Sequence, residues 1–131
     1  MSEAILPEGW SRPPGFSNGI LTDGRRHLAI GGQVGKDNIT GEMKQGFADQ
    51  WAQTLENIVT VVRAAGGQPT DITALRIYVT SIPAYREAGA ALAEGWKSTI
   101  GKHFPAMTLV EVTGLMEPDA YLEIDGDAVL S

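Results

Sequence analysis

The stretch from Gly46 to Ala65 constrains the fold more than any other part of the chain. Its apolar residues recur at spacings of three and four, which places them on one face of an amphipathic helix. These residues are Phe47, Trp51, Leu55, Ile58, Val59 and Val62. Gly66 and Gly67 then favour a left-handed stop, and Pro69 prevents continuation. We therefore expect a helix over residues 46–65.

A strand is expected over residues 72–79, because its side chains alternate in character. One side carries Leu75, Ile77 and Val79. The other side carries Ala74, Arg76 and Tyr78. The first side should therefore be the better buried of the two.

A second helix is expected to begin at Ser81, whose hydroxyl can accept a hydrogen bond from the first turn. Pro83 falls in that turn, where its missing N–H costs nothing. The inward stripe of this helix is Tyr85, Ala88, Leu92 and Trp96.

Four shorter apolar runs complete the expected elements. Residues 19–22 and 27–32 flank a turn at Asp23-Gly24, which predicts an opening hairpin with a positive φ at Gly24. Residues 108–113 and 120–129 are the last two strands. The order ββαβαββ predicts an α+β fold in which two helices cover one face of a mixed sheet.

The first 18 residues are rich in proline and glycine, so we expect an irregular or extended arm there. A chain of 131 residues is long enough for one core but not two, which predicts a single domain over 1–131. A sheet covered on one face leaves the other bare. A bare apolar face of more than a few hundred Å² is normally covered by another subunit, so we expect an oligomer.

Charge and composition exclude several kinds of partner. The net charge is −6 and no basic cluster stands out, which argues against nucleic acid. No run of about 18 apolar residues and no export signal occurs, so we expect a soluble cytoplasmic protein. Cysteine is absent, and His27 and His103 lack paired carboxylates at ligand spacing, so no metal is predicted.

Short motifs lie in a defined order along most of the chain. They are Gly31-Gly32-Gln33, Thr40-Gly41-Glu42, Gln50, Leu55-Glu56-Asn57, Ala64-Ala65-Gly66, Phe104-Pro105-Ala106, Val110-Glu111-Val112, Leu115 and Glu123-Ile124. Their order and spacing together resemble the RidA/YjgF family, whose members are also labelled endoribonuclease L-PSP or translation initiation inhibitors.

The resemblance implies a chorismate-mutase-like α+β fold with a mixed six-stranded sheet. It also implies a homotrimer with ligand clefts between neighbouring subunits. The activity it implies is cofactor-free hydrolysis of reactive enamines or imines, such as 2-aminoacrylate, to a ketoacid and ammonia.

The chain departs from the family at the positions that the resemblance assigns to the ligand. An arginine that holds the substrate carboxylate is replaced by Met107, which cannot form a bidentate salt bridge. Phe16 stands at a tyrosine position, Gly89 at an asparagine position and Leu109 at a position that is often cysteine. Loss of the arginine beside a retained Glu123 makes the pocket more negative, so we expect a neutral or cationic ligand.

Glu123 remains as the catalytic candidate, because its carboxylate can place water or relay a proton. Backbone groups around Gly31 and Gly32 can also contact a bound molecule. An ordinary outward-facing strand acid beside Asp125 explains Glu123 equally well.

Two functions stay open. The first is a cofactor-free hydrolase or deaminase of enamines, imines or related C–N compounds that differs from the standard 2-aminoacrylate deaminase. The second is a non-catalytic module that binds a small ligand or regulates a partner, which the exchanges at Met107, Phe16 and Gly89 favour.

Overall fold

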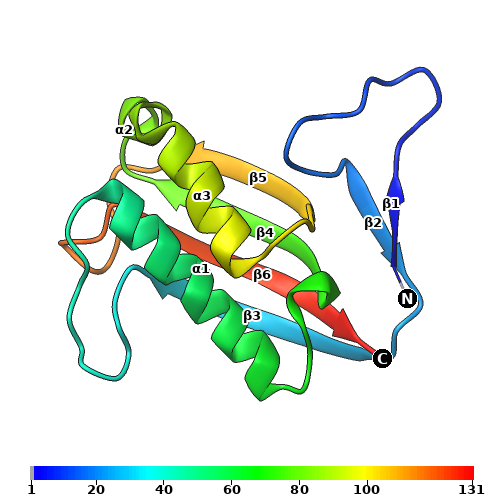
Figure 1. Ribbon diagram of the computed structural model, residues 1–131, viewed down its shortest axis with the longest axis horizontal. Coiled ribbons are helices and arrows are strands. Elements are labelled where there is room, and N and C mark those ends of the chain that lie inside the picture. The colour runs from blue at the N-terminus through cyan, green and yellow to red at the C-terminus, as the bar shows by residue number, and fades with distance from the viewer. Residues whose placement is uncertain (1) are drawn as a thin grey trace.

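Four strands form a mixed sheet, and three helices cover one of its faces in the computed structural model (Figure 1). The structure describes residues 2–131. Its elements are β1 (Ser2–Ile5), β2 (Gly19–Thr22), β3 (Arg26–Val34), α1 (Phe47–Ala64), a 3-10 turn (Pro69–Asp71), β4 (Ile72–Val79), α2 (Ile82–Ala88), α3 (Ala90–Thr99), β5 (Ala106–Glu111) and β6 (Leu122–Leu130).

The strand order of the main sheet is β3-β6-β4-β5. β6 is antiparallel to both of its neighbours, and β4 pairs with β5 in parallel. A parallel pair requires a crossover, which α2 and α3 provide. This arrangement confirms the expected α+β class and makes β5 an edge strand beside the helices.

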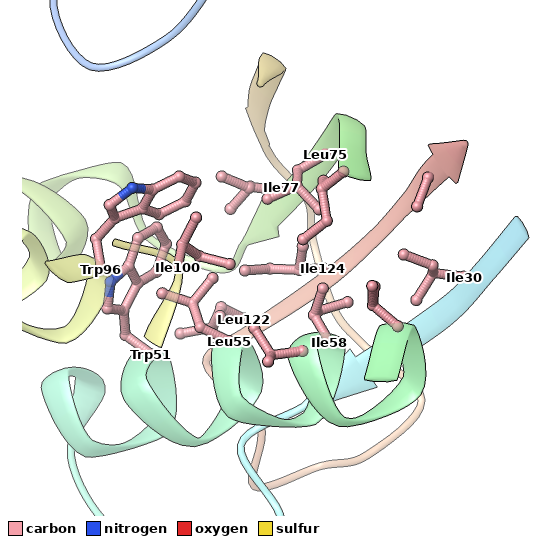
Figure 2. Packing of buried hydrophobic residues seen from close by; sticks show 14 of the residues in the cluster. Ile30, Trp51, Leu55, Ile58, Leu75, Ile77, Trp96, Ile100, Leu122 and Ile124 are labelled. Carbon is pink, nitrogen blue, oxygen red and sulfur yellow. The ribbon is translucent and has the colours of Figure 1, made fainter. Parts of the chain in front are cut away.

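The core lies between the sheet and α1, as the spacing of apolar residues predicts. Leu55, Ile58 and Val62 on α1 are fully buried. They belong to one cluster with the alternate residues of β4 and β6, including Ile77, Leu122 and Ile124 (Figure 2). Burial of each such side chain contributes about 1.5–3 kcal/mol. The predicted helix over 46–65 and the predicted strand over 72–79 are both confirmed.

The predicted opening hairpin is wrong. β2 pairs with β1, from Ser2 opposite Thr22 to Ile5 opposite Gly19, whereas β3 pairs with β6. A turn motif marks where the chain reverses, but burial decides which strands pair. Pairing with β6 lets β3 place Ile30 in the core.

The predicted positive φ at Gly24 is also absent. Close packing requires this glycine instead. A Cβ at Gly24 would lie 2.6 Å from Val129 Cγ1 and 2.9 Å from the carbonyl oxygen of Leu130, at the end of β6.

The predicted second helix is divided into α2 and α3. Gly89 lies between them with a φ of 53°, a conformation that glycine adopts without steric cost. The expected cap is confirmed, because Ser81 Oγ accepts a hydrogen bond of 3.1 Å from the Ala84 backbone N–H.

The first 18 residues contain a strand that the sequence did not predict. The density of proline and glycine obscures β1, which gains its hydrogen bonds from β2 in a separate two-stranded sheet. The six strands therefore divide into sheets of four and two. Ser17 forms an isolated parallel bridge to Ala106, which holds the end of the arm against the edge strand β5.

Candidate functional site

An apolar cavity of about 370 Å³ lies between the helices and the edge of the sheet, and Met107 is part of its wall. Met107 pairs with Leu75, whose side chain is buried on the helix side, so Met107 also points to that side. Trp51 of α1, Trp96 of α3 and Ile77 of β4 contribute to the same wall. Figure 2 shows both indole rings at one end of the core cluster. We call this cavity the aromatic pocket.

Hydrogen bonds hold the two indole rings in place. Trp51 Nε1 donates to the Leu92 carbonyl at 3.0 Å, and Trp96 Nε1 donates to the His103 carbonyl at 3.2 Å. Because both N–H groups are used, the small part of each ring that reaches the pocket is carbon surface. Tyr85 packs edge-on against Trp51, and Phe104 stacks on Trp96 with ring centroids 6.4 Å apart.

Two lysines give the aromatic pocket a positive rim. Lys97 near the end of α3 and Lys102 in the following loop both line it, and both are exposed. Neither forms an ion pair with a described residue. The Tyr85 hydroxyl likewise makes no hydrogen bond within residues 2–131. These are the polar groups left for a bound molecule.

The outer face of the sheet carries a network of charged and polar side chains. Arg76 of β4 donates to Asp125 and, at 2.9 Å, to Asp127, both on β6. Tyr78 donates to Asp125 at 3.0 Å. The bond to Asp127 raises the pKa of Arg76, and the bond to Asp125 raises the pKa of Tyr78. The centre of this face is therefore polar, which corrects the expectation of an apolar bare face.

Glu123 lies on the outer face, opposite Tyr78 on β4 and Val34 on β3. Its carboxylate packs over Gly32, where an added Cβ would lie 1.9 Å from Glu123 Oε2. Glu123 forms no hydrogen bond or ion pair within the described chain. The structure thus brings together Glu123 and Gly32 of β3.

The glycine pair itself forms a β-bulge. Ile30 is opposite Gly126 and Gln33 is opposite Ile124, so β3 has one more residue than β6 across this interval. Gly31 has open space around its Cα, and a Cβ added there would have no neighbour within 4 Å. The two glycines therefore differ, because only Gly32 faces the carboxylate.

Phe16 and Met107 also lie together. They line a second cavity of about 350 Å³, between the end of the N-terminal arm and strands β4 and β5. Arg76 lines this cavity as well, but its guanidinium is already paired with Asp125 and Asp127. Arg76 is thus no free substitute for the arginine that Met107 replaces.

Two other predicted ligand residues have structural explanations. Leu109 lies opposite Ile77 and packs against the core on the helix side. Gly89 is the break between α2 and α3. Met107 and Glu123 point to opposite faces of the sheet, so one chain does not unite them in one cavity.

Sequence reasoning missed part of the aromatic pocket. The spacing of apolar residues places Trp51 and Trp96 on the inward stripes of the two predicted helices, and both side chains are indeed nearly buried. Sequence reasoning did not select Tyr85, Lys97 or Lys102 as site residues. Helical spacing gave a signal for Tyr85 and Trp96, which both fall on the predicted inward stripe.

Among residues 2–131, no group of three or more histidine, aspartate and glutamate side chains is placed to hold a metal ion. No helix in the same range combines the length and the apolar character needed to cross a bilayer. The fold and the pocket define a small α+β protein with a ligand-sized cavity beside its edge strand.

Comparisons with known proteins identify the family. Residues 12–130 match the Endoribonuclease L-PSP family. A RutC family protein of Pyrococcus horikoshii is 32% identical over 129 residues, covering 98% of both chains. The 2-iminobutanoate/2-iminopropanoate deaminase of Escherichia coli is 32% identical over 102 residues, covering 78% of both. A Yersinia pestis protein of unknown function from the Rid family superposes with a TM-score of 0.84 at 32% identity, covering 98% of both chains.

This chain belongs to the endoribonuclease L-PSP family, also called RidA/YjgF. The resemblance seen in its motifs is therefore confirmed.

Proposed function

We propose that this protein binds a small metabolite against Met107 and does not act as a standard 2-aminoacrylate deaminase. The observation that carries the proposal is the apolar surrounding of Met107. Arg76, which lines the adjoining cavity, is already paired with two aspartates. A ligand carboxylate against Met107 would lose its hydration without gaining a cation, which is unfavourable.

The part of the ligand that contacts Met107 should therefore be uncharged. The sequence favoured a neutral or cationic ligand. Lys97 and Lys102 at the rim weigh against a cation, because like charges repel across a partly dehydrated pocket. An uncharged group at Met107 is the alternative that the geometry supports.

We further propose that the protein works as a homotrimer in the cytoplasm, without nucleic acid, membrane or cofactor. Within one chain Glu123 and Met107 face opposite sides of the sheet. A neighbouring copy that places its own Glu123 beside Met107 would unite them in a cleft between subunits. The family membership supports this arrangement.

Calorimetry with 2-oxobutyrate tests the proposal. We expect no saturable binding to the unchanged protein, because no free guanidinium meets the carboxylate. Met107→Arg should introduce binding, whereas Met107→Leu, which changes the side chain without adding charge, should not. Micromolar binding of 2-oxobutyrate to the unchanged protein would refute the proposal.

A cofactor-free hydrolase of imines or enamines is the second candidate function. It is favoured by the Glu123 carboxylate, which has no partner among the described residues and can act as a base toward water. It is also favoured by the relative named as a 2-iminobutanoate/2-iminopropanoate deaminase. Accelerated ammonia release from enzymatically generated imino acids, lost in Glu123→Gln, would support it. If ammonia release is not accelerated for any imino acid, the hydrolase is refuted and ligand binding remains as the proposed function.

A further inference from the structure

We propose, on the basis of the proposed function, that the ligand is an amphipathic anion: an apolar, planar body in the aromatic pocket, with a remote carboxylate or similar group at Lys97 and Lys102. The uncharged part of the ligand then contacts Met107, and the charge lies at the rim. A short ketoacid lacks such a body and cannot use both regions.

The walls of the aromatic pocket fit a planar apolar body. Trp51 and Trp96 are 4% and 8% exposed, so their rings are fixed by packing as well as by the bonds of their N–H groups. Aromatic walls that are already ordered contact a flat ligand with little loss of side-chain entropy. Met107 adds a polarizable thioether that favours aromatic neighbours.

The volume sets the size of the body. A cavity of about 370 Å³ lies near the lower end of the range of roughly 300–1,000 Å³ for small-molecule sites. It corresponds to about a dozen water-sized groups. One substituted aromatic ring with a short chain therefore fits, whereas a nucleotide does not.

The rim determines the sign of the charge. The chain has a net charge of −6, yet two lysines line this one apolar pocket and neither has an acidic partner among the described residues. Two uncompensated cations beside a low-dielectric surface attract an anion more strongly than isolated surface lysines do. The Tyr85 hydroxyl, also without a partner within residues 2–131, can donate a further hydrogen bond.

Two probes of nearly the same shape test the charge. They are 3-phenylpropionate and its uncharged amide, 3-phenylpropanamide. Binding is followed by tryptophan fluorescence in a Trp10→Phe background, in which Trp51 and Trp96 are the only tryptophans left. We expect the carboxylate to bind about fivefold to tenfold more tightly than the amide at low salt, and added salt should reduce this difference.

Matched variants locate the effect. Lys97→Gln with Lys102→Gln should abolish the preference for the carboxylate, while Lys44→Gln, which removes the same kind of charge outside the aromatic pocket, should keep it. Ala93→Phe places a ring in the pocket from an exposed position of α3 and should abolish binding of both probes.

Two results would overturn the inference. Equal affinity for the two probes, unchanged in the double lysine variant, would refute the anionic group. An uncharged ligand at Met107 would still be consistent with that result. Failure of both probes to bind would also refute the apolar, planar body of the ligand. The proposed function fails by a different result, saturable binding of 2-oxobutyrate to the unchanged protein.

Discussion

Gly32 has no room for a side chain, because the Glu123 carboxylate lies where its Cβ would be. The atoms that a Cβ would meet belong to the outer part of a flexible side chain rather than to backbone. The glycine therefore determines where the carboxylate sits more than whether the chain folds. Gly31, one residue earlier in the same bulge, has open space and does not have this role.

Gly32→Ala should displace the Glu123 carboxylate at a small cost in stability. We expect a loss of about 1 kcal/mol in the free energy of unfolding, as for other small insertions into packed sites. Denaturant unfolding measures it. In a Glu123→Ala background the same substitution should cost almost nothing, since the clash is gone.

Gly31→Ala is the matched control and should be insensitive to Glu123. An equal cost of Gly32→Ala in both backgrounds would show that the backbone of the bulge, rather than the carboxylate, requires this glycine.

At the scale of elements, Gln50 connects the first turn of α1 to two loops. Its Nε2 donates to the carbonyls of Lys44 at 3.0 Å and Asp119 at 2.9 Å, and its Oε1 accepts from the Tyr121 N–H at 2.8 Å. The side chain is 1% exposed. The buried amide makes all three of these bonds and so fixes the loop that precedes β6. This loop in turn positions Glu123, two residues after Tyr121.

Gln50→Met should destabilise the fold by about 2–4 kcal/mol, because it keeps the volume but leaves three backbone groups without partners. Thermal or denaturant unfolding measures the change. Gln45→Met, at an exposed position five residues earlier, is the control and should have little effect. A loss below about 1 kcal/mol for Gln50→Met would mean that water replaces the amide at low cost.

At the scale of the whole molecule, several apolar side chains remain exposed on one chain. Trp10 is 60% exposed, Leu21 59% and Val110 42%. They lie in the N-terminal arm, on β2 and on β5, whereas the centre of the outer face is the polar network of Arg76. Contact between copies would therefore combine apolar patches with a polar centre, as many protein interfaces do.

Light scattering coupled to size-exclusion chromatography should give a mass three times the 14.0 kDa of one chain at micromolar concentration. Val110→Asp introduces a charge on the outer side of β5 and should weaken this assembly. Ile39→Asp, at a loop residue that is 97% exposed, is the control and should leave the mass unchanged. A monomer for the unchanged protein would refute the trimer.

The sequence by itself determined the elements whose pattern is local. The helix over 46–65 and the strand over 72–79 follow from the spacing of apolar residues, and the motif order was sufficient to recognise the family. The substitution by Met107 was also visible without a structure. Side-chain periodicity depends only on neighbours along the chain, which is why these predictions succeeded.

Only the tertiary structure decided which strands pair and which side chains meet. The pairing of β3 with β6, the contacts of Arg76 with Asp125 and Asp127, and the aromatic pocket all join residues far apart in the chain. A shift of one residue in strand register moves every side chain to the other face. Register is set by burial across the whole sheet, so no local pattern could place Met107 and Glu123 on opposite faces.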